Sequence, residues 1–122
     1  MSEPQIEPTG EFACDLFALT DAEREHHVAM SAALFGSMVE ARELDHGYTM
    51  RLPDAPDTLA KLADFIALDR KCCPFFHFSV DVEPHDGPIW LKITGADGIK
   101  LPLQAELLGL LPDHVARQAG MR

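Results

Sequence analysis

The sequence is poor in basic residues and has no long apolar run, and each shortage excludes a class of function. Ten Lys and Arg stand against twenty Asp and Glu, which gives a formal charge of -10. Because phosphate binding needs a basic surface, we expect no nucleic acid and no acidic lipid surface as a partner. No apolar stretch approaches the roughly 20 residues that span a bilayer, and residues 1–10 do not resemble a signal peptide. We therefore predict a soluble, cytoplasmic protein.

Familiar catalytic motifs are also missing. The chain has no Gly-rich phosphate loop, no nucleophilic Ser elbow, no CxxC and no HExxH. It has only three cysteines, an odd number, and in a reducing compartment this predicts free thiols rather than a disulfide framework. A Cys–His nucleophile pair is conceivable, but no oxyanion hole is evident beside it. The sequence therefore favours a protein that is not an enzyme.

The apolar pattern predicts one α+β domain with the order α-β-β-α-β-β-α. A length of 122 residues suits a single core. Thr20 and Glu23 form a capping box for a helix that runs to about Phe35, where Gly36 can end it. Further elements follow from alternation and from helical periodicity: a hairpin of strands 38–44 and 48–52, a helix from Pro56 to the cysteine pair, strands 76–82 and 89–94, and a helix over residues 103–111. The strands are expected to form a four-stranded antiparallel sheet with the helices packed on it.

The two ends of the chain are predicted to lie outside this domain. We assign residues 1–11 to a flexible N-terminal tail, residues 12–113 to the domain and residues 114–122 to a polar C-terminal tail. The last helix is rich in leucine between Leu107 and Leu111. It has more apolar surface than one packing seam needs, which predicts a homodimer through this helix.

The run from Asp69 to Phe78 holds most of the functional information. It places two adjacent thiols, Cys72 and Cys73, directly before Pro74, which disfavours helical geometry at Cys73. Adjacent side chains of a regular helix point about 100° apart. The turn at the end of the helix is therefore the place where both sulfurs can approach one ion.

Thiolate and imidazole ligands suit zinc, Cu(I) and other thiophilic ions. We predict that Cys72, Cys73 and His77 bind such an ion or a thiol-reactive small molecule. One more ligand is needed for a closed tetrahedral zinc site, and the candidates are His26, His27, Asp69 and Cys14.

Other interpretations of these residues remain open. His77 is also consistent with an ordinary surface histidine, and Cys14 with a packing residue of an N-terminal arm. One of the adjacent histidines 26 and 27 is expected to be exposed and the other hydrogen-bonded. Asp69 and Arg70 suit either a pair that orients the cysteine turn or a weak surface ion pair. The protein as a whole is then either a structural or interaction module with packing cysteines and no cofactor, or a thiol redox protein.

Between about residues 20 and 110 the chain resembles a family of small bacterial proteins of uncharacterised function. The signature of the family is an acidic-Arg-any-Cys-Cys-Pro-Phe run, followed by an aromatic-rich strand, a strand that ends in Thr-Gly, and a closing helix. The matching positions are Asp69, Arg70, Cys72, Cys73, Pro74, Phe75, Phe78, Trp90, Leu91, Ile93, Thr94, Gly95, Gly98 and Lys100. Some members accompany heavy-metal-responsive regulators, so the resemblance favours a metal-binding role. It implies no catalytic residues.

Overall fold

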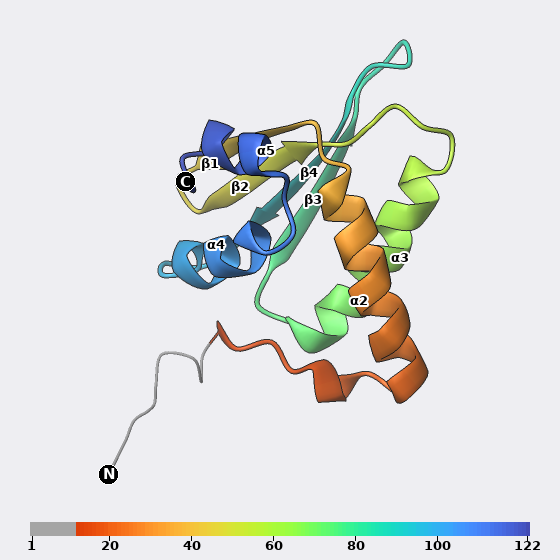
Figure 1. Cartoon of the computed structure of the whole chain (residues 1–122), viewed down its shortest axis with the longest axis vertical. Coiled ribbons are helices and arrows are strands. Elements are labelled where there is room, and N and C mark those ends of the chain that lie inside the picture. Colours follow the sequence, from red (N-terminus) through yellow and green to blue (C-terminus); the bar gives the residue numbers. More distant parts are fainter. Residues whose placement is uncertain (1–11) are drawn as a thin grey trace.

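A computed structural model describes residues 12–122 (Figure 1). The N-terminal tail predicted for residues 1–11 lies outside the described residues. The elements, in chain order, are η1 (Leu16–Ala18), α2 (Asp21–Gly36), β1 (Glu40–Leu44), β2 (Gly47–Arg51), α3 (Thr58–Cys72), β3 (His77–Val82), β4 (Ile89–Thr94), α4 (Lys100–Leu108) and α5 (Asp113–Gln118). The predicted order of helices and strands and the α+β class are confirmed.

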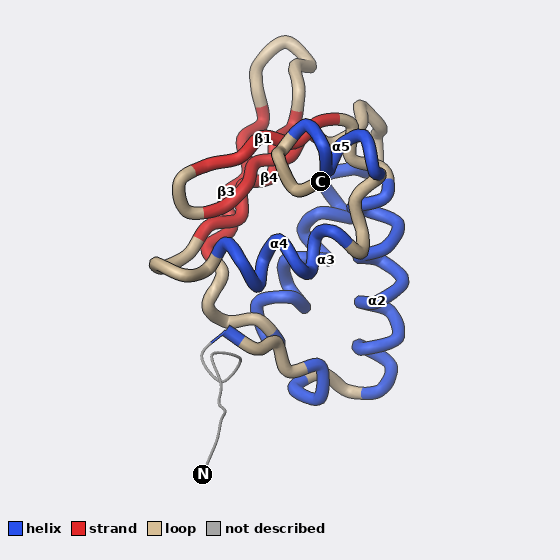
Figure 2. The backbone as a smooth tube through the Cα atoms, turned by 60° about the vertical axis from the view of Figure 1, so that its left-hand side comes forward, coloured by secondary structure: helices blue, strands red, loops and turns tan. Residues whose placement is uncertain are grey.

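The four strands form one antiparallel sheet in the order β1-β2-β4-β3. The helices lie on one side of this sheet, with α2 and α3 side by side (Figures 1 and 2). The side chains of Met50, Leu91 and Ile93 are buried beneath them. Gly47 has no room for a side chain, because an added Cβ would lie 2.0 Å from the carbonyl oxygen of Ile93. In the described part of the chain, none of the helices combines the length and the apolar character that crossing a membrane requires.

The start of α2 and the ends of α2 and α3 lie where local sequence signals place them. The Thr20 side chain accepts a hydrogen bond from the Glu23 amide, and the Glu23 carboxylate accepts one from the Thr20 amide, as the predicted capping box requires. Helix α2 ends at Gly36, and α3 ends at Cys72 before the turn that contains Pro74. The second of these endings leaves both cysteines at the same end of the molecule as the start of α2.

Two regions differ from the sequence prediction. In strand β3, Val80 pairs with the buried Leu91 and Val82 with Ile89, so both point to the helix side of the sheet as alternation predicted. They are nevertheless 40% and 57% exposed, where the prediction implied burial. The strand lies at the edge of the sheet, where the hairpin with β4 projects away from the helices (Figure 1). An amphipathic pattern cannot report that a strand is at an edge, and this explains the difference.

The C-terminal residues form a packed element where the sequence predicted a polar tail from 114 to 122. Helix α5 packs on β1, and its Val115 and Ala116 are fully buried. The leucine face used to predict a dimer is covered within this chain, since Leu103, Leu107 and Leu111 are all buried. Dimerisation through this helix therefore stays a prediction that has lost its main support.

A candidate thiol and metal site at the end of helix α3

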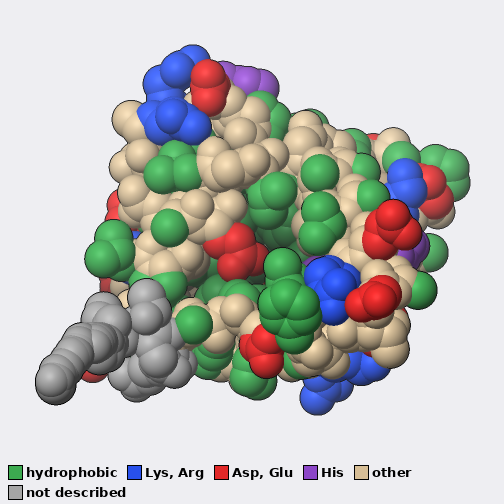
Figure 3. Space-filling model, turned by 60° about the horizontal axis from the view of Figure 1, so that its bottom comes forward, with side chains coloured by type: hydrophobic (Ala, Val, Ile, Leu, Met, Phe, Trp, Pro, Cys, Tyr) green, Lys and Arg blue, Asp and Glu red, His purple; other side chains and the backbone are tan. Residues whose placement is uncertain are grey.

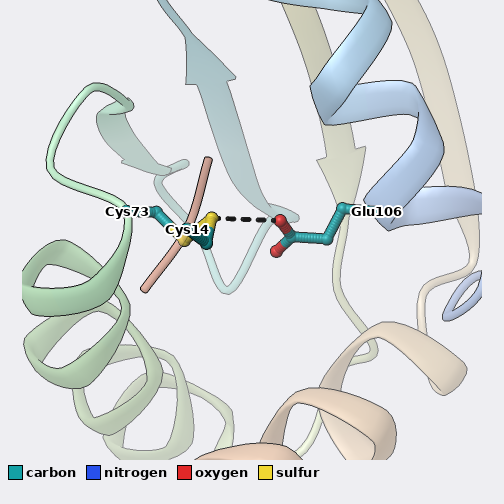
Figure 4. A group of neighbouring side chains, drawn as sticks. All are labelled: Cys14, Cys73 and Glu106. Atoms are coloured by element: carbon teal, nitrogen blue, oxygen red, sulfur yellow. Dashed lines mark hydrogen bonds between the residues drawn. A yellow bond between two sulfur atoms is a disulfide. The ribbon is translucent and has the colours of Figure 1, made fainter. Parts of the chain in front are cut away.

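The N-terminal arm, residues 12–19, crosses the end of α3 and brings a third cysteine to the predicted pair (Figures 1 and 4). The Asp15 amide donates a hydrogen bond of 2.8 Å to the carbonyl oxygen of Cys72. The ring of Phe12 contacts the ring of Phe75 edge to face, with 5.5 Å between the centroids. These contacts fix the arm against the turn after α3.

Cys14 and Cys73 are joined by a disulfide, with 4.5 Å between their Cα atoms. The prediction of three free thiols was therefore wrong, as was the interpretation of Cys14 as a simple packing residue. The two cysteines are 59 residues apart, and only the path of the arm across α3 makes them neighbours. The sequence contains no local signal for that path, so counting cysteines could not find the bond.

Cys72 is the remaining free thiol and is only 1% exposed. Its sulfur lies 3.7 Å from the Cys73 sulfur and 3.5 Å from the carbonyl oxygen of Asp69. Burial, with the carboxylate of Asp69 as the second cause, raises the pKa of the Cys72 thiol to about 11. At neutral pH this thiol is protonated, and a ligand must displace its proton.

A buried pair of His27 and Asp69 forms the wall of the site next to Cys72. The two side chains meet between α2 and α3, with 2.9 Å between Nε2 of His27 and Oδ1 of Asp69. The same oxygen lies 3.9 Å from the Cys72 sulfur and 3.8 Å from the Cys73 sulfur. This follows from the helical repeat, because residues three and four positions after Asp69 share its face of α3. Burial raises the pKa of Asp69, and the hydrogen bond with His27 opposes this shift.

Two polar atoms of this pair are buried without a partner. Nδ1 of His27 and Oδ2 of Asp69 make no hydrogen bond within the described residues. Buried polar atoms are nearly always satisfied, so such exceptions indicate a ligand site or strain. His27, Asp69 and Cys72 can each offer one ligand atom, and these three atoms lie within 4.8 Å of one another.

Glu106 of α4 lines the opposite side of the site (Figure 4). Its Oε2 lies 3.5 Å from the sulfur of Cys14. Because a disulfide sulfur carries no hydrogen, this contact is a hydrogen bond only when Glu106 is protonated. Burial raises the pKa of Glu106 to about 7, so the protonated form predominates below about pH 7.

These groups line a pocket of about 310 Å³ under the arm. Its residues are Cys14, Leu16, His27, Val28, Ser31, Asp69, Cys72, Cys73, Glu106 and Leu110. The corresponding end of the molecule is hollowed, with hydrophobic and acidic side chains around the hollow (Figure 3). The site is therefore a partly open cavity with sulfur, nitrogen and oxygen donors.

Replacing Glu106 with glutamine should change how stability depends on pH. The pKa of Glu106 is raised in the folded protein, so the folded state binds its proton more tightly than the unfolded state between about pH 4.5 and 7. Stability from this group is present at low pH and is lost as the pH rises through that window. Between pH 4.5 and 7 we expect the Glu106 carboxyl to reduce the free energy of unfolding of the wild type by about 1–2 kcal/mol, after allowing for its partial exposure.

Urea denaturation at several pH values between 4.5 and 8 measures this effect. The Glu106→Gln variant should lose less stability than the wild type over the same range. Glu25 is an exposed residue of α2, so Glu25→Gln serves as the control. If the free energy of unfolding depended on pH in the same way for the wild type and Glu106→Gln, this would contradict a raised pKa of the Glu106 carboxyl.

The predicted site residues do not all meet. Cys72 and Cys73 are brought together, and His27 and Asp69 lie beside them. Both of these neighbours were among the residues that the sequence suggested as an additional ligand. Two groups of potential metal ligands occur within residues 12–122, one of His27, Asp69 and Cys72 and the other of Cys14, Cys73 and Glu106. His77 is exposed on β3 and belongs to neither group. His26 is exposed and pairs with Asp64, so the prediction of one exposed and one bonded histidine is confirmed.

Two features of the site escaped the sequence analysis. Asp69 is buried and bonded to His27, so it forms neither the surface pair nor the orienting pair that was expected with Arg70. Glu106 had a signal that could have found it. It lies three residues after Leu103 and four before Leu110, which places a lone carboxyl on the apolar face of the last helix.

Comparisons with known proteins gave no relative. A scan against protein-family models found no match, and searches of curated proteins and of solved structures found none either. The fold and the site alone therefore define the class of this protein. It is a small α+β protein with a cysteine-containing pocket whose Cys, His and Asp side chains are placed where they could hold a metal ion.

Proposed function

We propose that the reduced protein binds one thiophilic metal ion, such as zinc, in the pocket at the end of α3. Cys72 and Cys73 supply two thiolates, and His27 supplies a third ligand that Asp69 holds in place. His77, which the sequence suggested, is not part of this ligand set. The fourth position faces the pocket and suits water or a small ligand, as in zinc sites with three protein ligands.

The distance between the two adjacent sulfurs is the observation that carries this proposal. A zinc–sulfur bond is about 2.3 Å long, so two thiolates on one tetrahedral ion lie about 3.8 Å apart. With the Cys14–Cys73 disulfide closed, the sulfurs of Cys72 and Cys73 are 3.7 Å apart, close to the tetrahedral value before the bond is reduced. A linear two-coordinate ion would instead need its sulfurs about 4.6 Å apart at the same bond length. The pair therefore suits a tetrahedral ion better than a linear one.

The His27–Asp69 pair has the arrangement that ligating histidines commonly use. When Nε2 of His27 donates a hydrogen bond to the carboxylate of Asp69, Nδ1 keeps its lone pair. In metal sites a carboxylate on the far nitrogen sets the tautomer and makes the imidazole a better ligand. The lack of any partner for Nδ1 supports its assignment as a ligand atom.

Binding of Zn(II) and Co(II) to fully reduced protein tests the proposal. We expect one ion per chain, and sulfur-to-cobalt charge-transfer absorption in the Co(II) form. The Cys72→Ser and Cys73→Ser variants should each bind at least about 100-fold more weakly, since loss of even an outer partner of a ligand costs 10–100-fold. Competition with a chromophoric chelator measures the affinity.

The matched control is His77→Ala, which removes an exposed imidazole close in sequence to the two cysteines. This variant should bind as the wild type does. Equal binding by the wild type and a Cys72→Ser/Cys73→Ser double variant would contradict the proposal. A large loss in His77→Ala would restore the ligand set that the sequence first suggested.

A thiol redox function is the second candidate, and the Cys14–Cys73 bond favours it. Glu106 supports it as well, because a carboxyl beside a disulfide sulfur can move a proton as the bond opens and closes. In this case the reactive thiol is Cys14 or Cys73, since burial leaves Cys72 protonated. Catalysed reduction of a model disulfide by wild type, and its loss in Cys14→Ala, would distinguish this function from ion binding.

A further inference from the structure

We propose that Cys14 and the metal ion compete for the sulfur of Cys73, so that oxidation by a low-molecular-weight disulfide releases the ion. This inference rests on the proposed ion-binding function and adds its regulation. Cys14 is then the redox partner of the site and not one of its ligands.

The competition follows from the position of one sulfur atom. The Cys73 sulfur is bonded to Cys14 and lies 3.7 Å from the sulfur of Cys72, its partner in the proposed ligand pair. The thiolate is the form that binds metals, and a sulfur in a disulfide has no thiolate form. With the bond closed, Cys72 is the one remaining thiol in the pocket. The ion therefore loses one of its two sulfur ligands when the bond forms.

The arm keeps Cys14 beside Cys73 even without the covalent bond. Two contacts hold the residues on either side of Cys14: the hydrogen bond from the Asp15 amide to the Cys72 carbonyl, and the edge-to-face contact of Phe12 with Phe75. Leu19, where the arm joins α2, is 3% exposed and belongs to the core. Groups held in contact react with a high effective concentration, so the bond can close without refolding.

The difference in exposure between the two cysteines sets the order of the reaction. Cys14 is partly exposed at the pocket, whereas Cys73 is 1% exposed. The Cys14 thiolate attacks the external disulfide RSSR, which forms a mixed disulfide and releases one thiol RSH. The Cys73 sulfur then attacks the Cys14 sulfur and releases the second RSH. In sum, two protein thiols are oxidised to one disulfide, and one RSSR is reduced to two RSH.

Thermodynamic linkage makes the competition reciprocal. If closing the bond weakens ion binding by a given factor, then bound ion disfavours closing the bond by the same factor. Both effects can be measured on the wild-type protein, and neither requires a variant.

The experiment compares Zn(II) affinity for fully reduced wild type and for wild type oxidised with oxidised glutathione. We expect the oxidised form to bind Zn(II) at least about 100-fold more weakly, the same loss that is expected for the Cys73→Ser variant. Saturating Zn(II) should slow the closure of the Cys14–Cys73 bond by oxidised glutathione at least about tenfold. The rate of closure is measured from the intact mass of the protein after its free thiols are alkylated. The matched variant is Cys14→Ala, which should bind as reduced wild type does and keep its ion after the same treatment.

Each result decides between the two ideas. Equal affinity of the oxidised and reduced wild type, with binding retained in Cys14→Ala, would overturn the competition and leave ion binding intact. Loss of the ion from Cys14→Ala under oxidised glutathione would also overturn it, because Cys14 would then not be the partner. Failure of reduced wild type to bind at all, with a circular dichroism spectrum equal to that of the oxidised form, would overturn both.

Discussion

Replacing Asp69 with alanine should lower the free energy of unfolding by about 3–5 kcal/mol, measured by urea denaturation of the protein without added metal. The side chains of Asp69 and His27 are 4% and 5% exposed, and the carboxylate oxygen Oδ1 is the hydrogen-bond partner of the imidazole. Removing the carboxylate leaves His27 buried without that partner and opens a space beside the two cysteines. Breaking a buried pair from one side is costly because the remaining polar group cannot reach water.

The neighbouring pair of His26 and Asp64 is a natural control for this prediction. It joins the same two helices, but its side chains are 53% and 40% exposed. Asp64→Ala should therefore cost less than about 1 kcal/mol, as exposed pairs usually do. Similar small losses in both variants would show that the His27–Asp69 pair is hydrated in solution and is not a sealed wall of the pocket.

Reduction of the Cys14–Cys73 bond should lower the free energy of unfolding by about 4 kcal/mol. The bond links positions 59 residues apart, and a loop of this length loses substantial chain entropy in the unfolded state. For a protein of 122 residues this corresponds to a fall in Tm of about 15 °C. Thermal melts with and without a phosphine reductant measure the shift.

Cys14→Ala controls for the reductant itself. Its Tm should match that of reduced wild type and should not respond to the phosphine. A wild-type Tm that is the same in both conditions would contradict a structural contribution from the bond. Added Zn(II) should restore part of the lost stability to reduced wild type, since a ligand that binds only the folded state stabilises it.

Much of the fold could be predicted because its signals are local. The capping box of Thr20 and Glu23 begins α2, and the turn that contains Pro74 ends α3 at the cysteines. The hairpin around residues 45–47 follows from alternation on both sides of a glycine-containing turn. Each of these features depends on residues a few positions apart, so the sequence contains all of the relevant information.

The prediction of which residues are buried failed where a residue's environment depends on segments far away in the sequence. Val80 and Val82 alternate as buried residues do, but β3 lies at the sheet edge and both are exposed. The C-terminal residues are polar on average, yet Val115 and Ala116 find a place against β1. Burial is a property of the whole arrangement, and short patterns report only which face is apolar.

The sequence by itself determined the class of fold, the start of α2, the ends of α2 and α3, and the presence of two adjacent thiols at a turn. Tertiary structure alone decided which groups surround them. It placed Cys14 against Cys73 across 59 residues, and it buried His27 against Asp69 between two helices. The physical reason is that the chemistry of a cysteine depends on neighbours within a few ångströms. In this protein those neighbours come from the arm, α2, α3 and α4, which only the folded chain brings together.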